Sequence, residues 1–111
     1  MKIAVIGSRG LMVDSLEKYL PPDTEEIVSG GAKGVDTSAR QYALANGIKL
    51  TEFLPEYDKY GRSAPLKRNI TITEYADLVL AFWDGKSRGT KFVIDSCKER
   101  GIAIKIFLPK K

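Results

Sequence analysis

The sequence predicts a single α/β domain with a doubly wound, parallel sheet of five strands. Five short apolar runs rich in β-branched residues recur along the chain, and segments with apolar residues at helical spacing separate them. Strands that are apolar along nearly their whole length are buried on both faces, which is typical of a parallel sheet covered by helices on each side. Right-handed crossovers then favour the strand order 3-2-1-4-5.

Length and composition narrow the class of protein. The 111 residues correspond to one domain, residues 1–111, with the 43% hydrophobic and 29% charged residues of an ordinary globular protein. The net charge of +4 suits an anionic ligand, but it is below the basic footprint of a dedicated nucleic-acid-binding domain. No apolar run approaches the roughly 20 residues that span a membrane. We therefore expect no membrane partner.

The histidine and cysteine counts exclude several kinds of site. The chain has no histidine and one cysteine, Cys97. This composition excludes a Ser-His-Asp triad, a Cys-His pair and a zinc site built on histidines or cysteines, so neither a metal nor a cofactor is predicted. A single cysteine permits no internal disulfide, and we therefore expect a reducing, cytoplasmic location.

The N-terminal part of the chain predicts a strand and a helix. Residues 2–6 form an apolar, β-branched run that ends at Gly7, as expected for a buried strand. After a short turn, residues 12–20 place apolar side chains on one helical face. Pro21 and Pro22 end this predicted helix, because proline removes a backbone donor and clashes with the preceding turn.

The next strand, loop and helix form the stretch around which the chain is organised. Residues 26–28 predict a strand, and the loop over residues 29–34 contains three glycines. From Val35, apolar or small side chains recur at i+4, i+7 and i+8, which predicts a helix that ends near Asn46. Glycine lets a ligand approach the main chain closely, and the first turn of a helix has unpaired N–H groups. The stretch therefore predicts an anion site of the kind that holds phosphate.

The middle of the chain continues the alternation. Residues 48–54 predict a third strand, 55–61 a polar and aromatic loop, and 63–75 a third helix. The loop exposes Tyr57 and Tyr60, which would suit a ligand lid or a protein interface equally well.

The last strands enclose a second glycine-rich turn. Residues 78–83 form the most apolar strand of the chain, and the turn over residues 84–89 follows it. Thr90 is the predicted cap of a last helix, and residues 102–108 predict the fifth strand. Trp83 ends an apolar strand, so a place in the core is favoured over stacking on a ligand base.

Three βα loops converge in this fold, because ligands of doubly wound sheets bind beyond the C-terminal ends of the strands. The loops over residues 7–10, 29–36 and 84–90 are all rich in glycine and hydroxyl side chains, and the third helix adds basic and amide groups. The candidate ligand-binding residues are Gly7, Ser8, Arg9, Ser29, Gly30, Gly31, Ala32, Gly34, Asp36, Arg68, Asn69, Asp84, Ser87, Gly89 and Thr90.

Three segments of the sequence carry a resemblance that covers nearly the whole chain. The segments VSGGAKGVDTSARQYALANG, APLKRNITI and LAFWDGKSRGTKFVID resemble the SLOG superfamily of Rossmann-like domains, and most of all its small YspA-like members of unknown function. Relatives in that superfamily include the Lonely Guy (LOG) phosphoribohydrolases and the DNA-processing protein A (DprA) family. The resemblance implies a site for a nucleotide or nucleotide-derived ligand, with phosphate cradled by the second-strand glycine loop and by the turn at Gly89 and Thr90.

The resemblance leads us to expect binding or sensing of such a ligand. Backbone N–H groups of both loops would hold phosphate, and Arg9 and Arg68 would add charge-assisted hydrogen bonds. Asp36 or Asn69 would select the sugar or base. For Asp36, two other interpretations stay open: a cap of the second helix, or a structural bond to the opposite loop. The Gly-x-Gly-x-x-Gly fingerprint is absent, so dinucleotide binding of the standard kind is not predicted.

Two alternative functions follow from the same resemblance. LOG enzymes carry a catalytic Glu three residues after the Thr that Thr90 resembles, and here that position is Val93. A nucleotide-processing hydrolase would therefore have to use Asp36, Asp84 or Asp95 as its acid or base. The second alternative is binding of single-stranded DNA, as in the DprA family. A homodimer is also compatible with the resemblance and the exposed tyrosines.

Overall fold

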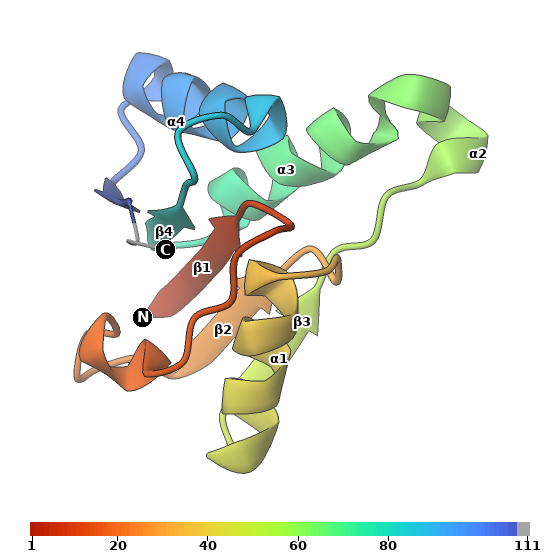
Figure 1. The fold of residues 1–111 in the computed structure, drawn as a ribbon. Helices are drawn as coiled ribbons and strands as arrows, with labels where there is room; N and C mark the ends of the chain where they lie inside the picture. Colours follow the sequence, from red (N-terminus) through yellow and green to blue (C-terminus); the bar gives the residue numbers. More distant parts are fainter. Residues whose placement is uncertain (109–111) are drawn as a thin grey trace.

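The sheet has the predicted architecture. The computed structural model describes residues 1–108, and it contains one sheet of five parallel strands in the order β3-β2-β1-β4-β5 (Figure 1). Register confirms the central place of β1, because Ala4 lies beside Val28 on one side and beside Val79 on the other. The strands are β1 (Lys2–Gly7), β2 (Glu26–Ser29), β3 (Lys49–Glu52), β4 (Leu78–Phe82) and β5 (Ile104–Phe107).

Helices cover both faces of the sheet, as the apolar strands predict. One face packs against the first long helix and the other against two long helices, while a short helix projects beyond the sheet (Figure 1). The helices are α1 (Val35–Ala45), α2 (Tyr57–Tyr60), α3 (Ala64–Tyr75) and α4 (Arg88–Arg100), with the short 3₁₀ turns η1 (Leu16–Lys18) and η2 (Gly61–Ser63). Among residues 1–108, no helix is both long and apolar enough to cross a membrane.

Strand β1 shows why the central strands are apolar throughout. Ile3 and Val5 belong to the core beneath α1, whereas Ala4 and Ile6 belong to the core beneath α3 and α4. Successive side chains of a strand point to opposite faces, so a strand between two helical layers needs apolar residues at every position. Cys97 is fully buried in the second of these cores.

The predicted helix over residues 12–20 is wrong. Only the 3₁₀ turn η1 forms there, and the chain before it is held by tertiary contacts. The Ser38 hydroxyl accepts a hydrogen bond of 2.9 Å from the Val13 backbone N–H, and Met12 is 56% exposed instead of facing the core. Two of the apolar residues in this stretch still pack into the core without forming a helix. Leu16 is buried, and Tyr19 packs edge-on against the ring of Phe82.

Smaller corrections concern two loops. Residues 55–61 do not form a simple loop, because α2 and the start of η2 occupy most of this stretch. The N-cap of α4 is Ser87, not Thr90, and the Ser87 hydroxyl accepts from the Thr90 backbone N–H at 3.5 Å. The edge strands β3 and β5 are also shorter than the apolar runs that predict them.

Candidate functional site

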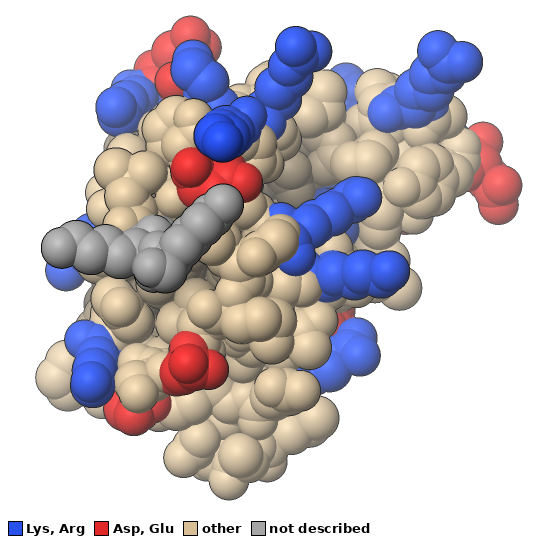
Figure 2. All heavy atoms as spheres, viewed as in Figure 1, with Lys and Arg blue, Asp and Glu red and all other residues tan. Residues whose placement is uncertain are grey.

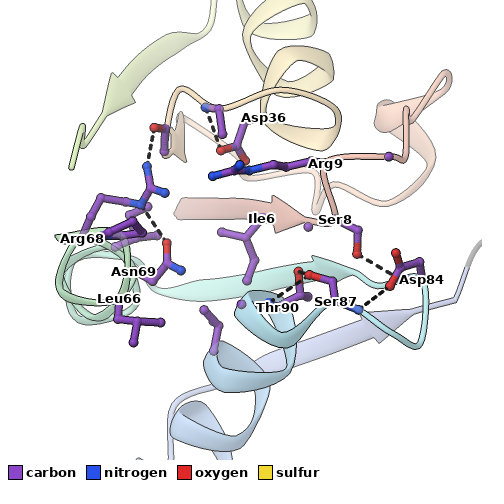
Figure 3. A pocket seen from close by; sticks show the side chains of 18 residues that line it. Ile6, Ser8, Arg9, Asp36, Leu66, Arg68, Asn69, Asp84, Ser87 and Thr90 are labelled. Carbon is purple, nitrogen blue, oxygen red and sulfur yellow. Dashed lines mark hydrogen bonds between the residues drawn. The ribbon is translucent and has the colours of Figure 1, made fainter. Parts of the chain in front are cut away.

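A cleft of ≈ 410 Å³ lies where β1, β2 and β4 end, and α3 forms one of its sides (Figure 3). It brings together residues from loops that are far apart in the sequence. The predicted residues that line it are Gly7, Ser8, Arg9, Gly30, Ala32, Asp36, Arg68, Asn69, Asp84, Ser87, Gly89 and Thr90. The structure therefore assembles one cavity from the three loops and the third helix, as the topology predicts.

The apolar part of the cleft was missed by the sequence analysis. The residues concerned are Ile6, Pro65, Leu66, Ile72 and Val93. A signal for two of them exists, since Pro65 and Ile72 share a helical face of α3 with the predicted Asn69. Val93 is 2% exposed and lines the cleft, so the cleft is apolar at that point.

Arg68 is fixed against the end of the sheet by three hydrogen bonds. Its Nη1 donates to the carbonyl oxygens of Gly30 and Phe53, at 2.5 and 3.3 Å, and its Nε donates to Asn69 Oδ1 at 2.8 Å. Burial lowers the pKa of Arg68, and the nearby Asp36 carboxylate opposes that shift. The Nη2 group donates to no partner among residues 1–108 and is available to an anion in the cleft.

Gly30 is a glycine because Arg68 occupies the space beside it. A Cβ atom on residue 30 would lie 2.5 Å from Nη1 of Arg68 and 2.8 Å from its Cζ. Any side chain at this position would therefore displace the guanidinium. The two predicted site residues, 38 positions apart in the sequence, depend on each other.

Asp36 holds the glycine loop in shape. Its Oδ2 accepts a hydrogen bond of 3.1 Å from the Ala32 backbone N–H, while the N-cap of α1 is Gly34 (Figure 3). The side chain therefore neither caps the helix nor bonds to the opposite loop. Burial raises the pKa of Asp36, and its bond to Ala32 and the charge of Arg68 oppose the shift.

Three predicted residues of the glycine loop are not part of the cleft lining. Ser29, Gly31 and Gly34 do not line it, and the Gly31 N–H donates instead to Ser29 Oγ at 3.4 Å. Gly34 has a positive φ of 75°, and a Cβ there would collide with the backbone carbonyls of Arg9 and Leu11. These three residues shape the loop, and their predicted contact with a ligand stays a prediction.

The turn after β4 is also tied by its own side chains. Asp84 Oδ1 accepts from the backbone N–H groups of Lys86 and Ser87 at 2.8 and 2.7 Å, and these bonds lower the pKa of Asp84. The buried Ser8 hydroxyl accepts from the Asp84 N–H at 3.2 Å, which joins the first and fourth strand loops. Trp83, half-buried against the core, donates its indole N–H to the Ser87 carbonyl at 3.0 Å.

The start of α4 presents backbone donors to the cleft. Among the described residues, the N–H groups of Arg88 and Gly89 have no acceptor. Gly89 lines the cleft, and a Cβ there would meet no atom within 4 Å, so the space above it is open. Unpaired N–H groups and the positive end of a helix dipole favour an anion at this place.

Two basic side chains, Arg9 and Arg68, line the cleft. Figure 2 shows several Lys and Arg side chains on the side of the molecule where α2 and the strand ends lie. Arg9 is exposed and extends across the mouth toward the side that carries Arg68 (Figure 3). The positive charge of Arg9 contributes to the lowered pKa of Arg68, so the two guanidinium groups repel each other. A negatively charged group between them would relieve that repulsion.

The carboxylates of the cleft are both engaged in structure. Asp36 and Asp84, which alone among the acidic residues line it, bind backbone N–H groups of their own loops. Asp95 lies outside the lining and pairs with Lys91 at 2.8 Å. The lining thus offers donors for an anion, and each of its two carboxylates uses one oxygen to bind backbone N–H groups of its own loop.

Comparison with known proteins adds no relative. No protein-family model, no curated protein and no solved structure matches the chain.

Proposed function

We propose that the cleft binds a nucleotide or nucleotide-derived ligand through its phosphate. The observation that carries the proposal is Arg68, held by the ends of two strands with one guanidinium nitrogen left for a ligand. On the same cleft, the unpaired N–H groups at the start of α4 supply a second set of donors. Guanidinium and backbone N–H groups together are a common combination for phosphate.

The rest of the lining suits the nucleoside part of such a ligand. Ile6, Ile72 and Val93 give the cleft an apolar floor against which a base or sugar can pack. Asn69 uses its Oδ1 to hold Arg68, which leaves its amide N–H groups to donate to a base or sugar oxygen. A site with a few placed polar groups and an apolar floor is typical of small-molecule binding.

Binding is favoured over hydrolysis by the state of the carboxylates. A general base needs an acceptor that can reach a water or a substrate proton. Asp36 Oδ2 and Asp84 Oδ1 hold the loops that form the cleft, so both carboxylates already have a structural role, and Val93 supplies no acid. We therefore propose a domain that binds or senses its ligand.

The test is titration calorimetry with each of the four ribonucleoside 5′-monophosphates and with the corresponding nucleosides. We expect saturable binding of at least one nucleotide, and binding of its nucleoside that is weaker by roughly tenfold or more, because the phosphate takes the charge-assisted hydrogen bonds. Equal affinity of nucleotide and nucleoside, or no binding of any nucleotide, would contradict the proposal.

A further inference from the structure

A second cavity lies on the other side of α3. This groove, of ≈ 280 Å³, is lined by residues that include Phe53, Leu54, Tyr60, Ala64, Lys67 and Arg68. Pro65, Asn69 and Ile72 of the same helix face the first cleft instead. The two cavities thus use different faces of α3, and Arg68 is the one residue among 1–108 that lines both of them.

Arg68 forms the wall between the two cavities. Its guanidinium reaches from α3 to the Gly30 carbonyl at the end of β2 and to the Phe53 carbonyl just after β3, and Figure 3 shows it at the edge of the cleft. The guanidinium thus bridges the helix and the strand ends at this point. A ligand phosphate bound to Arg68 therefore lies at the boundary of both cavities.

The groove has the chemistry of a base-stacking site. Tyr60 is 37% exposed and Leu54 is 63% exposed, so both present apolar surface to the solvent. The ammonium groups of Lys59 and Lys67 lie 5.2 and 6.0 Å from the centre of the Tyr60 ring. An aromatic ring flanked by lysines is suited to stack a base and to attract the adjoining phosphate.

An acidic side chain completes this surface. Glu56, an exposed residue just before α2, also lines the groove, and its carboxylate can accept a hydrogen bond from an amino group of a base. The groove therefore offers stacking, positive charge and one acceptor, and it adjoins the phosphate-binding wall of the cleft.

We infer that the ligand of this protein has at least two nucleotide units joined by a phosphodiester, with one unit in the cleft and the next in the groove. The inference rests on the proposed function and narrows its ligand class. The linking phosphate lies at Arg68, and the second base stacks on Tyr60. Such a ligand differs from the dinucleotide cofactors, which need a Gly-x-Gly-x-x-Gly loop that this chain lacks.

The experiment compares one-unit and two-unit ligands on matched variants. The ribonucleoside 5′-monophosphates of all four bases, and the four 5′-phosphorylated homodinucleotides, are titrated into the wild-type protein and into Tyr60→Ala and Tyr57→Ala. Both tyrosines lie in α2, which contains no buried residue, so neither change should unfold the domain. Tyr57 does not line the groove and is the control.

We expect a dinucleotide to bind the wild-type protein roughly 5- to 150-fold more tightly than the matching mononucleotide, the range that base stacking gives. Tyr60→Ala should remove most of this gain and leave mononucleotide affinity unchanged, whereas Tyr57→Ala should change neither. Equal affinity for mononucleotides and dinucleotides would overturn this inference and leave the proposed function standing. The same holds if the gain in dinucleotide affinity persists in Tyr60→Ala. Absence of binding by both ligand classes would overturn the proposed function as well.

Discussion

The guanidinium of Arg68 lies where a side chain on residue 30 would have to be. An ideal Cβ on Gly30 falls 2.5 Å from Arg68 Nη1, and the Gly30 carbonyl accepts the hydrogen bond that fixes the same nitrogen. Position 30 therefore requires glycine because Arg68 occupies the space of a side chain. It does not require glycine for a positive φ angle. The second strand and the third helix are joined at the cleft by this contact, which also sets the boundary between cleft and groove.

The carboxylate of Asp36 gives the domain a stability that depends on pH. Its pKa is raised above the usual value of 3.8 mainly by burial, so between these two pKa values the folded state binds more protons than the unfolded state. The contribution of Asp36 to the stability of the folded state therefore falls as pH rises through this window. Asn at residue 36 can still accept from the Ala32 N–H and has no charge to bury. We expect Asp36→Asn to gain stability relative to wild type as pH rises above about 4, measured by urea unfolding at several pH values.

Comparison of Asp36→Ala with Asp36→Asn separates the effect of the hydrogen bond to Ala32 on stability from the effect of the buried charge. Asp36→Ala leaves the Ala32 N–H without its acceptor, and such a loss costs about 1–3 kcal/mol where the donor is buried. We expect Asp36→Ala to be less stable than Asp36→Asn at every pH tested. Equal stability of the two variants would show that the hydrogen bond does not hold the loop.

Gly34 should be among the least replaceable glycines. Its φ of 75° is strained for any L-residue, and its Cβ would also collide with the backbone carbonyls of Arg9 and Leu11. Gly101 has a similar φ of 69°, but a Cβ there meets nothing within 4 Å. We expect Gly101→Ala to cost about 1 kcal/mol of unfolding free energy and Gly34→Ala clearly more. Chemical denaturation of both variants checks this, and equal losses would mean that backbone strain alone decides the cost.

Ser87 should stabilise α4 from its N-terminus. Its hydroxyl accepts from the Thr90 N–H, but at 3.5 Å the bond is long, so we expect Ser87→Ala to cost about 0.5–1 kcal/mol, the lower part of the range for N-caps. Ser96 lies in the middle of the same helix and provides the matched control. We expect Ser96→Ala to leave the free energy of unfolding unchanged or to raise it slightly, because alanine is the better helix former. Thermal unfolding of the two variants distinguishes a cap from an ordinary helical serine.

Much of the fold could be predicted because the strands are apolar on both faces. Ile3, Ala4, Val5 and Ile6 leave no polar face for solvent, and a parallel sheet between helices is the architecture that buries such a strand. The strand order and the position of the cleft then follow from topology. This is why residues as distant as Ser8 and Asp84 could be assigned to one site before any contact was known.

The features of the fold and the site that were not predicted depend on tertiary contacts, which hydrophobic periodicity does not reveal. Residues 12–20 have helical spacing, yet the Val13 N–H donates to Ser38, a residue of the following helix. The contact between Arg68 and Gly30 likewise joins segments that sequence patterns treat separately. The apolar floor was missed because Ile6 looks like any core residue of a strand until the loops around it are placed.

The most direct test of the account is the affinity of the Gly30→Ala variant for a nucleotide. The titration uses the ribonucleoside 5′-monophosphate that wild type binds best, with Gly101→Ala as a glycine-to-alanine control away from the cleft. We expect Gly30→Ala to displace Arg68 and weaken binding by roughly 10- to 150-fold, as for loss of a hydrogen bond to a charged group, while Gly101→Ala binds like wild type. Unchanged affinity in a folded Gly30→Ala protein would contradict the claim that Arg68, held against Gly30, binds the ligand phosphate.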